Sequence, residues 1–104
     1  MSETVTGGEA IVRSLVAHGV DTVFALPGVQ TYPVMDALAR HAEQIRTFSA
    51  RHEQATAYMA FGYAQATGKV GVYSVVPGPG VLNTMGALCT VSYTHLRAHE
   101  TQRY

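Results

Sequence analysis

The sequence predicts an α/β fold in which helices cover both faces of a parallel sheet, giving three layers in the order αβα. Short apolar runs that end at turns alternate with longer stretches of helical spacing. Strands separated by helices of this length imply right-handed crossovers, which build a parallel sheet. The chain has 104 residues, 47% of them hydrophobic, and this size permits one small domain.

The first predicted pair of elements is a helix over residues 9–18 and a strand over residues 22–26. The apolar residues of the helix fall on one stripe: Ile11, Val12, Leu15 and Val16. Gly19 follows as a candidate for the left-handed residue that ends a helix. The run TVFAL then stops at Pro27-Gly28, as expected of a buried strand that enters a turn.

The middle of the chain repeats this order with a helix over residues 33–43 and a strand over residues 45–50. Pro33 suits the first turn of a helix, because the amide that proline lacks has no partner there. Val34 and Leu38 then fall on one side of the helix.

The third pair is a helix over residues 53–67, closed by Gly68, and a strand over residues 70–76. Residues 81–89 are predicted to be the beginning of a further helix. Alanine and glycine leave little side-chain bulk on any face of the 53–67 helix. Its apolar character around most of the surface predicts burial on several sides.

Ligands of parallel α/β sheets gather at the carboxyl ends of the strands. In this chain the three strand ends are followed by residues 27–30, 50–53 and 77–80, which we expect to lie along one rim. Glu53 lies on that rim and is the first residue of the most apolar predicted helix of the chain.

Glu53 has two interpretations from the residues alone. An acid in the first turn of a helix is favoured by the helix dipole, by about 0.3–1 kcal/mol, and this structural role suffices to explain it. Alternatively, it is a partly buried acid used in proton transfer. Desolvation by Ala57 and Phe61 would then raise its pKa, and Arg51 and His52 would oppose that shift if they point inward.

The GPGVLN stretch at residues 78–83 has the first two glycines of a dinucleotide-binding fingerprint, with Asn83 in the place of the third. A nucleotide-binding oxidoreductase fragment is therefore one alternative, and a tight structural turn is another. A third alternative is a non-catalytic module that dimerises through the 53–67 helix, since small residues permit close approach of a second element.

Composition argues against several classes of partner. Lys and Arg total 7, as do Asp and Glu, so neither nucleic acid nor an anionic membrane is expected. The single cysteine, Cys89, excludes an intrachain disulfide and fits a reducing compartment. The polar N-terminus is unlike a signal peptide, and no apolar run reaches the ~20 residues of a membrane span. We expect a cytoplasmic protein.

The character of the sequence changes after Thr90, and we interpret residues 91–104 as a probable non-native tail. The string VSYTHLRAHET matches a translation of DNA that resembles a transposase-type sequencing-library adapter. His95 and His99 have i, i+4 spacing, but two histidines are a weak signal for a metal. If residues 91–104 are non-native, this signal for a metal has no meaning, and no metal site is predicted. The domain is then residues 1–90.

Four segments together resemble the N-terminal pyrimidine-binding domain of thiamine-diphosphate enzymes: GVDTVFALPG (19–28), DAL (36–38), RHEQATAYMAFGYAQATGKVGV (51–72) and GPGVLN (78–83). The resemblance covers residues 5–90 in order and is strongest to the group of acetolactate synthase, pyruvate oxidase and benzoylformate decarboxylase.

This resemblance implies a role for Glu53. The matching glutamate of the family hydrogen-bonds N1′ of the cofactor's aminopyrimidine, and so promotes loss of the thiazolium C2 proton; the resulting ylid attacks a 2-keto acid. The cofactor supplies the difficult chemistry and the protein tunes it. The resemblance also implies cofactor-binding positions beside the pyrimidine: Glu53, Pro27, Gly28, Val76, Pro77, Gly78 and Asn83.

The resemblance further implies a parent enzyme that is a 2-keto acid carboligase or decarboxylase, as a homodimer or homotetramer. Thiamine diphosphate would be anchored through Mg²⁺ by a downstream domain, and FAD is possible in the parent. Since no such diphosphate-binding motif occurs in these 104 residues, we expect the fragment alone to be inactive.

Overall fold

The computed structural model describes residues 4–93 of the chain. The elements follow one another in this order: α1 (Gly7–Ala17), β1 (Thr22–Ala25), the 3-10 turn η1 (Val29–Thr31), α2 (Tyr32–Arg40), β2 (Arg46–Phe48), α3 (Glu53–Thr67), β3 (Tyr73–Ser74), α4 (Pro79–Leu82) and α5 (Met85–Tyr93). None of the helices in this part of the chain is long and apolar enough to cross a membrane.

The three strands form a parallel sheet with the order β2-β1-β3. The central strand β1 is buried along its whole length, and Phe24 is paired with Phe48 of β2 on one side and Tyr73 of β3 on the other. The rings of Phe24 and Phe48 stack with their centroids 5.8 Å apart.

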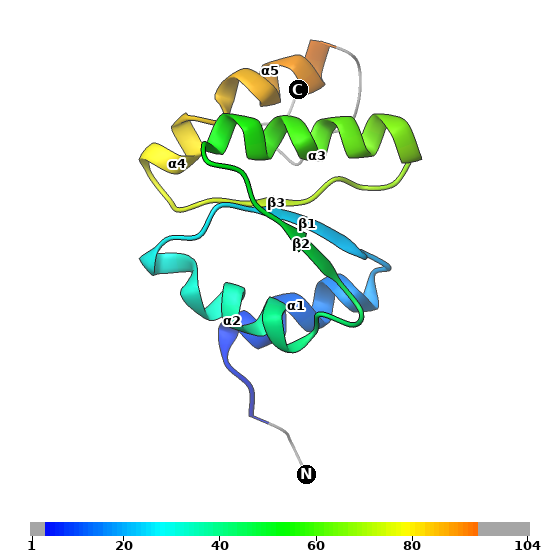
Figure 1. Cartoon of the computed structure of the whole chain (residues 1–104), viewed down its shortest axis with the longest axis vertical. Helices are drawn as coiled ribbons and strands as arrows, with labels where there is room; N and C mark the ends of the chain where they lie inside the picture. Colours follow the sequence, from blue (N-terminus) through cyan, green and yellow to red (C-terminus); the bar gives the residue numbers. More distant parts are fainter. Residues whose placement is uncertain (1–3, 94–104) are drawn as a thin grey trace.

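Helices cover both faces of this sheet (Figure 1). Helices α1 and α2 lie together on one face, and α3 lies on the other, between the sheet and α5. The three-layer αβα fold with a parallel sheet, predicted from the sequence, is confirmed.

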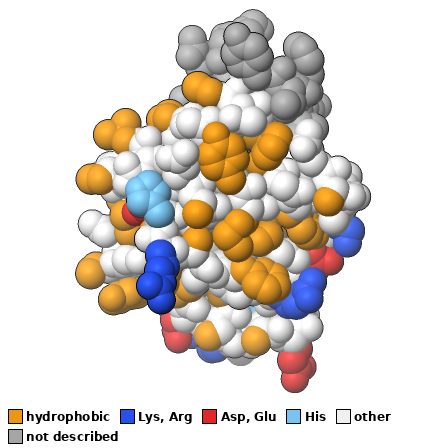
Figure 2. Space-filling model, turned by 45° about the horizontal axis from the view of Figure 1, so that its top comes forward, with side chains coloured by type: hydrophobic (Ala, Val, Ile, Leu, Met, Phe, Trp, Pro, Cys, Tyr) orange, Lys and Arg blue, Asp and Glu red, His pale blue; other side chains and the backbone are white. Residues whose placement is uncertain are grey.

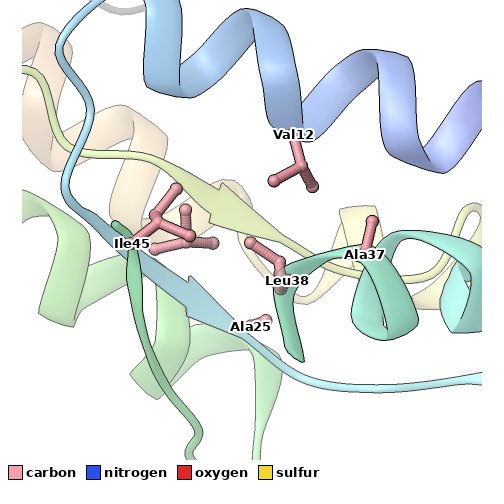
Figure 3. Packing of buried hydrophobic residues seen from close by; sticks show 6 residues of the cluster. Val12, Ala25, Ala37, Leu38 and Ile45 are labelled. Atoms are coloured by element: carbon pink, nitrogen blue, oxygen red, sulfur yellow. The ribbon is translucent and has the colours of Figure 1, made fainter. Parts of the chain in front are cut away.

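The main core lies between the sheet and the α1–α2 layer (Figure 3). Its buried members are Val12, Val23, Ala25, Ala37, Leu38 and Ile45. Leu15 and Val16 pack against this cluster as the helical stripe predicts, but Ile11 is 51% exposed. The predicted stripe was therefore one residue too wide, because the sheet-facing side of α1 accommodates Val12 and not its neighbour.

A buried carboxylate joins the two helices of this layer, and the sequence analysis missed it. Glu9 of α1 accepts hydrogen bonds from Arg13 (2.8 Å) and, across the helix pair, from Arg40 (2.8 Å). Its Oε2 also lies 2.6 Å from Nε2 of His41. These bonds lower the pKa of Glu9 to about 2, with Arg40 having the largest effect.

The helix ends follow the sequence signals closely. Thr6 caps α1 by accepting a hydrogen bond from the Glu9 amide at 3.1 Å. Gly19 and Gly68 follow α1 and α3 with φ angles of 81° and 73°, the left-handed conformation expected of glycines that end helices.

The last predicted elements differ most from the structure. The expected strand over residues 70–76 is reduced to β3, which pairs with β1; the carbonyls of Val72 and Ser74 accept hydrogen bonds from the amides of Phe24 and Leu26. The expected helix over residues 81–89 is two helices, and the first begins earlier, at Pro79. They separate because the Thr84 hydroxyl donates to the Val81 carbonyl at 2.7 Å, which closes the short helix α4.

Helix α3 is less buried than its apolar sequence predicts. Thr56, Ala57 and Ala60 are buried against the sheet and α5, but Gly62 is exposed. Figure 2 brings the α5 side of the molecule forward and shows hydrophobic side chains spread over this face. The large hydrophobic residues of α3, α4 and α5 that are exposed are Tyr58, Val81, Leu82 and Met85.

Candidate functional site

The loops that follow the three strands meet at one rim, as the sequence analysis expected. A methyl group built on Gly28 would lie only 2.0 Å from Cγ1 of Val76, so the first and third loops are in close contact. A methyl group on Gly80 would lie 2.9 Å from Cγ2 of Val76 and 3.7 Å from Cγ of Glu53. Val76 and Gly80 therefore link the first loop to the start of α3.

Glu53 is the first residue of α3, and its side chain is partly buried. The residue before it, His52, caps the helix, because its Nδ1 accepts a hydrogen bond from the Gln54 amide at 3.0 Å. This role fixes the tautomer of the ring, since an acceptor nitrogen carries no proton. The Thr56 hydroxyl donates to the His52 carbonyl at 3.2 Å and further secures this turn.

One interpretation of Glu53 from the sequence has desolvation raise its pKa, but the net shift of the pKa in the structure is downward. Its own backbone amide and the Asn83 side chain both donate hydrogen bonds to the carboxylate, which lowers the pKa below its ordinary value. Desolvation opposes this shift but is outweighed. The carboxylate therefore rests in its ionised form in this structure.

Asn83 ends α4, and its Nδ2 lies 3.1 Å from Oε1 of Glu53. The two positions are 30 apart in the sequence, with the rest of α3 and the whole of β3 between them, so the contact arises from the fold and not from local sequence.

The first rim loop is held by Thr31, whose hydroxyl accepts from the Gly28 amide and donates to the Gly28 carbonyl, both at 3.1 Å. Pro27 of this loop and Pro77 of the third are exposed on the rim. Gly78, also exposed, has a φ of 77°, a conformation that favours glycine before α4.

Of the predicted site residues, Gly28, Val76, Glu53 and Asn83 thus join in one continuous set of contacts, while Pro27, Pro77 and Gly78 lie on the same loops. Gly80 belongs to this set but was not predicted as a site residue. Its signal was the second glycine of the GPG sequence, which marks a position where another chain segment approaches closely.

The site offers one ionised carboxylate beside valine and glycine surfaces. Such a set suits a flat heteroaromatic ring that can stack on apolar surface and share a proton between a ring nitrogen and the carboxylate. Within residues 4–93, no three His, Cys, Asp or Glu side chains come together as ligands.

Comparison with known proteins places the chain more specifically. The sequence model of a family described as "Thiamine pyrophosphate enzyme, N-terminal TPP binding domain" matches residues 5–97. A probable 2-ketoarginine decarboxylase of Pseudomonas aeruginosa is 46% identical over 86 residues, which cover 83% of this chain and 15% of that protein.

Two acetolactate synthases show the same relationship. The protein of Mycobacterium avium is 44% identical over 86 residues, and that of Arthrospira platensis is 43% identical over 88 residues. Each match covers 83% of this chain but only 14% and 15% of the respective relative. The chain therefore spans about one seventh of the length of these curated relatives.

Proposed function

This chain belongs to the thiamine pyrophosphate enzyme family, whose N-terminal cofactor-binding domain it matches, and we propose that it supplies the residues that activate the cofactor's aminopyrimidine ring. Glu53 is the catalytic residue of this proposal. The contact between Glu53, Gly80 and Val76 at the rim of the parallel sheet is the observation that carries it.

The chemistry of the site supports this role. Bound thiamine diphosphate supplies the electron sink for breaking or forming a carbon–carbon bond next to a carbonyl group. Glu53 would hold a proton between its carboxylate and a ring nitrogen, and the surfaces of Gly28, Val76 and Gly80 would orient the flat ring and exclude water from it. Asn83, Pro27, Pro77 and Gly78 complete the proposed binding loops.

The substrate class follows from the relatives. Both the decarboxylase and the synthases named above suggest a parent enzyme that acts on 2-keto acids. We propose that the Mg²⁺ and diphosphate anchor and any FAD site lie in other parts of the parent protein. We also propose that the parent is a homodimer or homotetramer. The chain alone is therefore expected to be inactive.

The nucleotide-binding alternative finds no support in the geometry of the GPG loop. Helix α4 is only four residues long and begins with Pro79, which has no amide hydrogen to donate to a phosphate.

A chimera tests the proposal without requiring any other part of the parent protein. Residues 5–90 would replace the matching segment of the Mycobacterium avium acetolactate synthase, to which they are 44% identical. We expect the chimera to form acetolactate from pyruvate when thiamine diphosphate and Mg²⁺ are present. Glu53→Gln in the chimera should lower kcat by roughly 100-fold or more, as loss of proton transfer typically does.

The matched control is Glu43→Gln, which removes an exposed carboxylate that lies beyond α2. This variant should keep the activity of the chimera. A Glu53→Gln chimera that remained as active as the unmutated one would refute the assignment of Glu53, and a folded but inactive chimera would refute the proposed function.

A further inference from the structure

Asn83 and Glu53 form a side-chain contact between the end of α4 and the start of α3, with Nδ2 of Asn83 3.1 Å from Oε1 of Glu53. We propose that Asn83 is a positioning residue, which acts through Glu53 by holding its carboxylate in one orientation and favouring its ionised form. This inference rests on the proposed function, since it assigns to Asn83 control over the group that would exchange the proton.

The orientation of the Asn83 amide follows from charge. If its oxygen faced Glu53, that oxygen would lie against a carboxylate that carries no hydrogen to share. The amide nitrogen must therefore be the atom that faces Oε1. A neutral donor aimed at a carboxylate favours the charged form without adding a charge of its own.

Hydrogen bonds of the surrounding backbone and of Thr84 hold Asn83 in place. Its backbone amide donates to the Pro79 carbonyl at 3.0 Å, which completes the turn of α4. The next residue, Thr84, is fully buried, and its hydroxyl donates to Val81 and accepts from the Tyr73 hydroxyl at 3.1 Å. The amide is thus carried on a turn that is tied to β3, so its position is set before any ligand arrives.

Gly80 lies between Val76 and Glu53. It is buried, and a side chain at this position would meet Cγ2 of Val76 at 2.9 Å and would lie at an ordinary van der Waals distance of 3.7 Å from Cγ of Glu53. A residue larger than glycine would therefore have to displace the Val76 side chain. The second glycine of GPGVLN thus keeps α4 close to Val76, while the asparagine three positions later reaches the Glu53 carboxylate.

The pKa of Glu53 reflects this arrangement. The hydrogen bond from its own backbone amide is the largest cause of the lowered pKa, and that from Asn83 is the second. Any glutamate at the start of a helix with this geometry can accept the hydrogen bond from its own amide, whereas the second hydrogen bond depends on the side chain at position 83. Changing Asn83 should therefore alter the proton affinity of Glu53 and leave α3 intact.

Titration of the carboxyl carbons by NMR in the full 104-residue chain, with ¹³C-labelled glutamate and no thiamine diphosphate, tests the inference. Asn83→Leu removes the donor at an exposed site and should raise the pKa of Glu53. The pKa of Glu9, about 2, should not move, because its partners lie on the other face of the sheet. Gln54→Leu removes another exposed amide beside Glu53 and serves as the matched control, with no change expected.

Asn83→Asp covers the case in which leucine disturbs the fold, because it keeps the size of the side chain. It replaces the donor by a like charge and should raise the pKa of Glu53 further than leucine does. Asn83→Gln restores a donor and should return the pKa toward the wild-type value.

An unchanged Glu53 pKa in both Asn83→Leu and Asn83→Asp would overturn the positioning role. That outcome is distinct from failure of the proposed function, because the titration involves no cofactor, whereas the chimera assay keeps Asn83 unchanged and compares only variants at other positions. Conversely, a raised pKa would support the role of Asn83 toward Glu53 even if the chimera were inactive.

Discussion

His41 Nε2 lies 2.6 Å from Oε2 of Glu9, joining α2 to α1 through a carboxylate that is only 10% exposed. The other ring nitrogen of His41 lies 3.0 Å from Oε1 of Gln44. Both nitrogens thus face oxygen acceptors, an arrangement that only the protonated imidazolium can satisfy fully. The hydrogen bonds to Gln44 and then Glu9 raise the pKa of His41 above its ordinary value of 6.5, against desolvation and the charge of Arg13, which lower it.

The first prediction is a loss of stability at alkaline pH that depends on His41. A group with a raised pKa in the folded state contributes stability fully below its unfolded pKa, and this contribution disappears as the pH rises through the folded value. The urea midpoint of unfolding should therefore be lower at about pH 8.5 than at about pH 6. His41→Gln keeps a donor for Glu9 but cannot titrate in this range, so its midpoint should change much less.

The matched control for that comparison is His18→Gln, since His18 is exposed and its Nδ1 lies 2.8 Å from the carbonyl oxygen of Ser14 in α1. This variant should retain the wild-type pH dependence. If His41→Gln and wild type lost the same stability between the two pH values, the Glu9–His41 contact would not be the cause.

The second prediction concerns the contact between two rim loops. Gly28 has an extended φ of −159°, which any residue can adopt, so the cost of Gly28→Ala is steric. Its new methyl group would lie 2.0 Å from Val76, and such overpacking should lower the free energy of unfolding by about 1–3 kcal/mol.

Val76→Ala removes the clashing methyl groups and should restore part of this loss in the double variant. The measurement is a double-mutant cycle by urea unfolding. Strictly additive effects of Gly28→Ala and Val76→Ala would show that the two loops do not touch in solution.

The third prediction separates two glycines, one within α3 and one just after it, by their backbone conformation. Gly62 lies in the middle of the helix with open space at its Cβ position, so Gly62→Ala should stabilise the protein by about 0.5–1 kcal/mol. Gly68 also has open space but a φ of 73°, so Gly68→Ala should destabilise by about 1–2 kcal/mol. Thermal unfolding of both variants checks the opposite signs, and a shift of the same sign would contradict the helix boundary at Thr67.

The sequence predicted the layers of this fold because each helix and strand has its own periodic pattern and turn signals. The bounds of α3 were predicted without error, since Glu53 and Gly68 mark both ends. The extent of β3 could not be predicted, because strand length depends on which neighbours pair with it. Here the segment is hydrogen-bonded to β1 on one side only among the described residues.

The candidate site shows the same limit. Residue types and strand ends placed Glu53 on the rim, and the family pattern proposed a function for it. One of its two interpretations had desolvation raise the pKa, whereas the net shift is downward, because the hydrogen bond from its own amide and then that from Asn83, 30 positions away, outweigh desolvation. The buried Glu9 was missed for a similar reason. Two of its partners, Arg40 and His41, come from the next helix. The prediction of a non-native tail mainly concerns residues beyond 93, outside the described part of the chain, and stays a prediction.

The last prediction compares two isoleucines that sequence patterns alone do not distinguish. Ile45 is 1% exposed and belongs to the core between the sheet and the α1–α2 layer, as Figure 3 shows. Ile45→Ala should therefore lower the free energy of unfolding by about 2–5 kcal/mol, because it loses buried contacts and leaves a cavity. Ile11→Ala, at a position 51% exposed, should change it by no more than about 0.5 kcal/mol. Urea unfolding of both variants measures the difference, and equal losses would place Ile11 inside the core and contradict the orientation of α1.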